Sequence, residues 1–172
     1  MTPTHIGTPF TCDGHAIEWL CRLDVYAVPG SRNVFLAHPW GANVDGVDYV
    51  APGDMETDGV SAGRLLWRVL DPPIRSLLFP GSVIHDAAYG GILLAVDRHG
   101  NELTVDRTHA DWLLSILGRA NGYGRIKGQV VHVVISALGW PRWNELHAYN
   151  AQFIDRTKWE YRWQDFVTPE RP

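Results

Sequence analysis

The chain has 172 residues, of which 45% are hydrophobic and 20% are charged, and this composition is typical of one globular domain with a core of its own. The net charge of −4 argues against generic nucleic-acid binding, because such binding needs a basic face. The stretch from Met1 to Phe10 has neither the basic start nor the apolar region of a signal peptide, and no segment approaches the roughly 18 apolar residues of a membrane span. We therefore expect no signal peptide and no membrane span, and free thiols at Cys12 and Cys21.

The first part of the chain, residues 16–56, is predicted to be rich in strands. Apolar and polar side chains alternate from Ile17 to Val25, which is the period of a half-buried strand. The turn dipeptide Pro29-Gly30 separates this strand from the next. Further along we expect a strand at 34–37, a loop at 38–43 and a short strand at 47–50 that ends before Pro52-Gly53.

From residue 57 to about residue 140 the pattern favours helices. A loop at 57–61 is followed by a short apolar segment at 65–70. Ser82 is a candidate N-cap for a helix that runs to Tyr89 and ends at Gly90-Gly91. The stretch 92–96 suits either a strand or a continuation of that helix.

Two more helices are expected after this point. Asp106 or Thr108 can cap a helix in which Ala110, Leu113, Leu114 and Leu117 have helical spacing. After a break at 122–124, a helix over 126–138 places Val130, Val133, Val134 and Ala137 on one face, although this β-branched run would also suit a strand.

These elements predict an α+β fold in a single domain, 1–172. An N-terminal antiparallel β segment (16–56) precedes a small core of about three helices (57–140). The C-terminal extension, 141–172, mixes aromatic and charged residues, and we expect it to be either a last strand packed on the body or an arm for a partner.

An ionisable group inside an apolar segment is the most informative feature of the chain. His85 and Asp86 lie in the predicted helix that ends at Tyr89, and burial of unpaired charge is costly. His85 and Tyr89 are four residues apart and share a face, whereas Asp86 is turned away from it. Asp111, on the next apolar helix, is a candidate partner for His85.

This set has the parts of a hydrolytic site. Imidazole titrates near neutral pH, so His85 is a candidate base that activates water. Asp111 can orient His85 by accepting a hydrogen bond from the other ring nitrogen. Asp86 points elsewhere and is a candidate ligand for Ca²⁺, together with backbone carbonyls of the loop at Asp58 and Gly59.

Structural alternatives remain open for each residue. Asp86 can pair with Arg64 or Arg107, and Asp111 can be a core aspartate that accepts hydrogen bonds from loop backbone. The whole set can then form a buried polar network that fixes helix packing.

Other metal sites are also conceivable. A zinc site can be drawn from His85, His99 and His109, and a metal dyad like that of HD phosphohydrolases from His85-Asp86 with the histidine at 38 and an aspartate at 97 or 111. Neither set has a typical ligand spacing.

The order of the motifs resembles a protein family. Thr57-Asp58-Gly59-Val60-Ser61, His85-Asp86-Ala87-Ala88-Tyr89 and Ala110-Asp111 follow one another as in the family of domain of unknown function 1353, over roughly residues 20–140. That family occurs largely in tailed phages and prophages. The resemblance implies a phage- or prophage-derived protein, located in the host cytoplasm or in the virion.

A more distant likeness implies an activity. The set is similar to the catalytic core of secreted phospholipase A2, and by that likeness His85 is the base, Asp86 binds calcium, Asp111 orients His85 and Tyr89 supports the hydrogen bonds. The expected function is therefore hydrolysis of an ester, such as a lipid. The alternative is a non-enzymatic virion component or host-factor binder, which has phage virion proteins as its partners.

Overall fold

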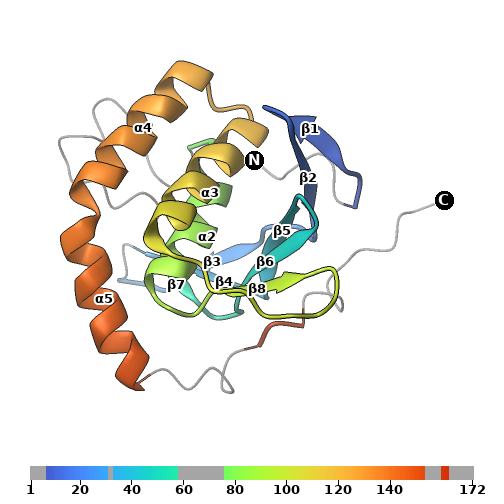
Figure 1. The fold of residues 1–172 in the computed structure, drawn as a ribbon. Coiled ribbons are helices and arrows are strands. Elements are labelled where there is room, and N and C mark those ends of the chain that lie inside the picture. The colour runs from blue at the N-terminus through green and yellow to red at the C-terminus, as the bar shows by residue number, and fades with distance from the viewer. Residues whose placement is uncertain (1–6, 31–32, 58–75, 154–159, 163–172) are drawn as a thin grey trace.

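The computed structural model describes residues 7–30, 33–57, 76–153 and 160–162. These residues form eight strands and four helices, and the strands come mainly first, so the expected α+β class is confirmed. Figure 1 shows the strands β1, β2, β5, β6 and β8 to the right of α2 and α3, and the helices α4 and α5 to their left. The predicted loop at 57–61, apart from Thr57, and the apolar segment at 65–70 lie outside the described residues.

Two antiparallel sheets make up the β part. The larger sheet has the order β1-β2-β5-β6-β8, and the smaller has the order β3-β4-β7. The strands of the larger sheet are β1 (Phe10–Cys12), β2 (His15–Trp19), β5 (Trp40–Val44), β6 (Val47–Ala51) and β8 (Leu94–Asp97). Those of the smaller sheet are β3 (Val25–Ala27), β4 (Val34–Leu36) and β7 (Glu56–Thr57).

The prediction of a loop at 38–43 is wrong, because β5 starts at Trp40. Trp40 and Ala42 are fully buried, and the Trp40 indole Nε1 donates to the Cys21 carbonyl at 3.2 Å. Gly41 allows the close approach, since a Cβ there would collide with the Tyr49 carbonyl. Burial against partner strands thus overrides the weak strand propensity of Gly, Ala and Asn. The long strand expected from Ile17 to Val25 is in fact split, because β2 ends at Trp19 and β3 begins at Val25.

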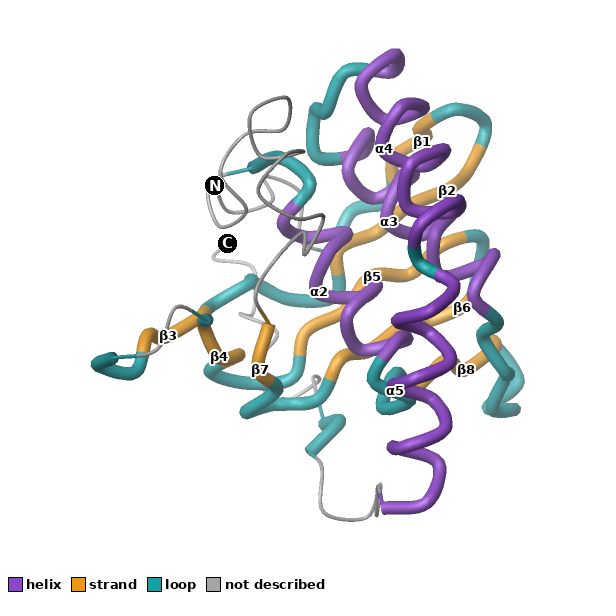
Figure 2. The backbone as a smooth tube through the Cα atoms, turned by 90° about the vertical axis from the view of Figure 1, so that its left-hand side faces the viewer, coloured by secondary structure: helices purple, strands orange, loops and turns teal. Residues whose placement is uncertain are grey.

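The helices are α2 (Phe79–Tyr89), α3 (Arg107–Ala120), α4 (Arg125–Leu138) and α5 (Trp140–Phe153). In Figures 1 and 2, α4 and α5 follow one another along the outer side of the molecule. The helix α2 packs against α3 and against strands β6 and β7. None of the described helices has the length and apolar character needed to cross a membrane.

The helices α2 and α3 approach closely because each has a glycine at the contact. A Cβ on Gly81 would lie 2.6 Å from the Leu114 carbonyl oxygen, and a Cβ on Gly118 would overlap the Leu78 side chain. Side chains one or two helix turns from these glycines can therefore meet directly across the interface. This close packing is what brings residues 85 and 111 within reach of each other.

Local capping signals predicted some helix ends and missed others. Asp106 is the N-cap of α3, and its Oδ1 accepts from the His109 amide at 2.7 Å. Ser82 is not the N-cap of α2, which begins at Phe79 with Pro80 in its first turn, where proline is well tolerated. Ser82 Oγ instead donates to the Phe79 carbonyl at 2.8 Å.

The C-terminal extension does not begin as a strand or an arm, because Trp140–Phe153 is helical. Beyond it the chain returns to the body. The Glu160 carbonyl accepts from the Gly53 amide at 3.1 Å, and Tyr161 Oη donates to the Ile92 carbonyl at 2.5 Å.

Candidate functional site

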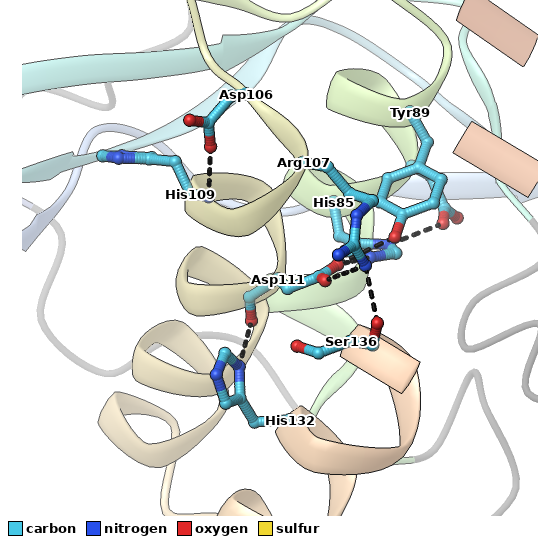
Figure 3. A network of polar contacts seen from close by, with 9 residues as sticks. His85, Tyr89, Asp106, Arg107, His109, Asp111, His132 and Ser136 are labelled. Atoms are coloured by element: carbon cyan, nitrogen blue, oxygen red, sulfur yellow. Dashed lines mark hydrogen bonds and ion pairs between the residues drawn. The ribbon is translucent and has the colours of Figure 1, made fainter. Parts of the chain in front are cut away.

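The histidine and the aspartate that were predicted to be partners meet between two helices. His85 Nε2 lies 3.2 Å from Asp111 Oδ1, so α2 and α3 each contribute one half of the pair (Figure 3). Asp111 is completely buried and the His85 side chain is 12% exposed. Asp86 Oδ1 lies 3.7 Å from His85 Nδ1, which is too far for a hydrogen bond but close enough for attraction between charges. The expectation that Asp111, and not the neighbouring Asp86, bonds to His85 therefore agrees with the geometry.

Tyr89 supports the same carboxylate. Its hydroxyl donates to Asp111 Oδ1 at 2.8 Å, and its ring centre lies 4.1 Å from that of His85. Trp143 packs edge-on against the Tyr89 ring at 4.9 Å. The backbone of Gly139 passes so close to the Tyr89 hydroxyl that a Cβ at this position would collide with it. These contacts leave the Tyr89 side chain a single arrangement, with its hydroxyl on Asp111.

Arg107 is the third side chain that binds the Asp111 carboxylate. The sequence had suggested Arg107 only as a partner for Asp86. Its Nη1 lies 3.2 Å from Asp111 Oδ2 and donates to the Ser136 carbonyl at 2.8 Å. The spacing of Arg107 and Asp111 on one helix, four residues apart, is the signal that could have found this pair. The reach to Ser136, on α4, has no counterpart in the local sequence.

His132 also binds to this part of α3. Its Nδ1 lies 3.3 Å from the backbone carbonyl oxygen of Asp111. Figure 3 shows His132 beside the backbone of Asp111 and Ser136 beside Arg107. On α4, His132 bonds to Asp111 directly and Ser136 bonds to it through Arg107, so Asp111 connects α3 with both α2 and α4.

The surroundings of the pair favour the charged carboxylate of Asp111 and the protonated imidazole of His85. Burial alone would raise the pKa of Asp111, but the hydrogen bonds from His85 and Tyr89, with the charges of His85 and Arg107, lower that pKa below its usual range. Burial alone would lower the pKa of His85, but the hydrogen bond to Asp111 and the attraction of Asp86 outweigh it and raise that pKa. Burial and the nearby Asp111 raise the pKa of Tyr89, so its hydroxyl stays protonated and can donate.

Asp86 is held by the residue that precedes the predicted calcium loop. Thr57 Oγ1 donates to Asp86 Oδ2 at 2.5 Å, and Thr57 is the last residue of β7. Thr57 directly precedes Asp58 and Gly59 in the sequence. Asp58 and Gly59 themselves lie outside the described residues, so their role as calcium ligands stays a prediction.

The alternative metal sites gain no support from the arrangement. Within the residues that the structure describes, no three His, Cys, Asp or Glu side chains are grouped so that they could hold a metal ion. His109 bonds to the Tyr49 hydroxyl at 2.8 Å, and His99 lies in the turn after β8. His38 lies 3.5 Å from Asp24. His38 and His109 thus each contact a residue outside the sets that a zinc or phosphohydrolase-type site would need.

Comparison with known proteins gives this site no precedent. No family model matches the chain, and neither a curated protein nor a solved structure does. The two likenesses drawn from the motifs therefore stay predictions.

Proposed function

We propose that this chain is a phage- or prophage-derived ester hydrolase with a site of the phospholipase A2 kind, which acts in the host cytoplasm or in the virion. His85 activates water, and Asp111 and Tyr89 orient His85. The observation that carries the proposal is the pair of hydrogen bonds in which Tyr89 Oη and His85 Nε2 meet on one oxygen of Asp111. A buried carboxylate that holds one imidazole nitrogen is the arrangement that makes the other nitrogen basic.

The proposed mechanism depends on which ring nitrogen of His85 bonds to Asp111. With the Nε2 proton donated to Asp111, the lone pair of neutral His85 is on Nδ1, the nitrogen on the side of Asp86. Nδ1 takes a proton from water, and the hydroxide oxygen attacks the ester carbonyl carbon. Asp111 stabilises the imidazolium that forms, and Nδ1 then gives its proton to the leaving alkoxide as the acyl–oxygen bond breaks.

Charge on the carbonyl oxygen needs a stabilising group. Asp86, which is one-fifth exposed and bonds to Thr57, is the residue whose carboxylate would hold Ca²⁺ together with carbonyls of Asp58 and Gly59. Such an ion would supply positive charge for the developing oxyanion. The chain's own part is to place the Asp86 carboxylate beside the basic nitrogen.

The test measures release of fatty acid from phosphatidylglycerol–phosphatidylcholine vesicles, with added Ca²⁺ and with a chelator. General-base catalysis contributes about 10²- to 10⁴-fold, so we expect His85→Asn to lose activity by that factor. Asp111→Asn should lower the rate as well, since the carboxylate then no longer stabilises the imidazolium. His99→Asn, in an exposed turn, is the matched control and should retain full activity. Equal activity of wild type and His85→Asn would refute the proposal.

The pH profile gives an independent check. Only neutral His85 can accept a proton from water, and its pKa is raised. Activity should therefore increase with pH through a midpoint above the ordinary histidine value of about 6.5. A rate that falls over the same range would contradict a base at His85.

A second candidate function is a non-enzymatic virion or host-interaction protein. The observation that favours it is the full satisfaction of Asp111, which is completely buried and bonds to α2 through His85 and to α4 through Arg107. A network of this kind fixes helix packing without any reaction. Stoichiometric recovery of the protein from purified virions would support this function, and a calcium-dependent esterase activity that needs His85 would exclude it as the only role.

A further inference from the structure

The helix α4 is apolar on two opposite faces. On its inner face, Val131 is completely buried and packs with Leu78, Leu114 and Tyr123. The outer face carries a row of exposed apolar side chains that continues into the first residue of α5. The row is Ile126 (79% exposed), Val130 (46%), Val133 (64%), Ala137 and Trp140 (59%). At about 100° per residue these five positions fall within an arc of roughly 80°.

The surroundings of this outer row are positively charged. Residues 112–144 contain four Lys and Arg and no Asp or Glu, whereas the whole chain has a net charge of −4, so the remainder carries −4 − 4 = −8. Arg125 and Lys127 are exposed, lie on either side of Ile126, and form no ion pair with any residue that the structure describes. Arg119 and Arg142, by contrast, pair with Asp13 and Glu145.

The size and charge of the row argue against a second copy of the chain. From Ile126 to Trp140 a helix rises about 21 Å, so a row one side chain wide covers roughly 200 Å². A stable dimer buries about 800 Å² per partner. In a parallel arrangement, a second copy would also bring its own Arg125 and Lys127 towards those of the first. Nucleic acid is an equally poor fit, because its binding needs a track of cations and not a row of exposed valines.

An anionic membrane surface fits both the exposed apolar row and the cations beside it; the Trp140 ring at the end of the row is 59% exposed and also contacts the Arg107 guanidinium, 5.5 Å from the ring centre. A helix that lies in the plane of the interface buries apolar side chains at the boundary of the acyl chains and keeps its basic side chains among the headgroups. Tryptophan is favoured at that depth because its ring is apolar and its N–H is polar. We propose that the outer face of α4, from Ile126 to Trp140, binds peripherally to anionic phospholipid membranes. This binding does not depend on chemistry at His85.

The test is co-sedimentation of the full chain with vesicles of phosphatidylglycerol and phosphatidylcholine, and with vesicles of phosphatidylcholine alone. Each exposed cation near an anionic surface strengthens binding about fivefold, so two cations should give a preference of roughly 25-fold for the anionic vesicles. Val130→Asp with Val133→Asp should weaken binding at least tenfold. Arg125→Gln with Lys127→Gln should remove the preference for anionic lipid.

The control variant is Leu103→Asp, which also places an acid on an exposed apolar residue, 40% exposed, but outside α4. It should bind as the wild type does. Absence of wild-type binding to anionic vesicles would overturn the proposal, as would unchanged binding by the double valine variant. A wild-type dimer in light scattering that the valine variant converts to monomers would overturn it in favour of a second copy. Because the readout is binding, His85→Asn should sediment like the wild type even if no hydrolysis is found.

Discussion

Two histidine–aspartate pairs in this molecule have opposite settings. His15 and Asp45 meet at the surface with Nδ1 and Oδ2 2.7 Å apart, and their side chains are 36% and 49% exposed. His85 and Asp111 are farther apart, at 3.2 Å, but Asp111 is completely buried. The surface aspartate bonds to one imidazole and one backbone amide, whereas the buried aspartate bonds to three side chains on two helices. The shorter distance therefore belongs to the pair that we expect to matter less, because solvent screens it.

The largest expected difference between the two pairs is in stability. Asp111→Asn leaves the mostly buried side chains of Arg107 and His85 without their counter-charge, and loss of one partner of a buried pair costs about 3–5 kcal/mol. We expect the free energy of unfolding, measured by urea denaturation, to fall by that amount. A fall of less than 1 kcal/mol would show that the buried pair contributes no more than a surface pair.

A smaller effect is expected at the tyrosines that bond to aspartates. Tyr89→Phe removes a buried donor to Asp111 and should cost about 1–3 kcal/mol. The matched control is Tyr26→Phe, since Tyr26 also donates to an aspartate, Asp54 at 3.0 Å, but is exposed. Urea denaturation should detect no change for that control. Equal losses for both variants would mean that burial does not set the strength of these bonds.

The next effect is expected in how the contribution of the buried pair to stability changes with pH. The folded-state pKa of His85 is raised, so its contribution is complete below the unfolded value of about 6.5 and is lost as pH rises through the folded value. The folded-state pKa of Asp111 is lowered, so its contribution is present above about 3.9 and is lost as pH falls through the folded value. Stability should therefore decline from about pH 6.5 upwards, and His85→Asn should abolish most of that decline. A curve for His85→Asn that is parallel to the wild type would assign the decline to other groups.

The smallest expected effect is that of Asp45→Asn. Asparagine tolerates the left-handed backbone at this position, where φ is 52°, so the change removes the charge without new strain. The loss should be below about 1 kcal/mol, as for other exposed pairs, and should vanish at high salt. A larger loss would place the surface pair in the same class as the buried one.

What the sequence could predict was local. His85 and Tyr89 share a helix face because they are four residues apart, and the cap at Asp106 needs only a side chain and an amide three residues away. Asp111 was recognised as the partner because a buried carboxylate on an apolar helix requires one. The dipeptide Asp45-Gly46, with φ of 52° and 86°, also marks the hairpin between β5 and β6, and this signal would have placed Trp40–Val44 in a strand.

What the sequence could not predict depends on distant segments. The strand β5 is stabilised by the Cys21 carbonyl and by the close approach of Tyr49, and neither is evident from Trp40 to Asn43. The bond from Arg107 to Ser136 joins residues on different helices and follows from how α4 packs. The face of α4 that carries Val130 and Val133 turned out to be exposed, because Val131 takes the inner position.

Gly139 has no functional side chain, yet the packing around Tyr89 and Asp111 restricts which residue can occupy position 139. Any residue with a Cβ would push on the Tyr89 hydroxyl, which lies between the glycine backbone and Asp111. Over evolutionary time, descendants that keep tyrosine at 89 and aspartate at 111 should also keep glycine at 139. A lineage in which that glycine is replaced should show compensating change at Tyr89, and the two positions should therefore vary together although they are fifty residues apart in the sequence.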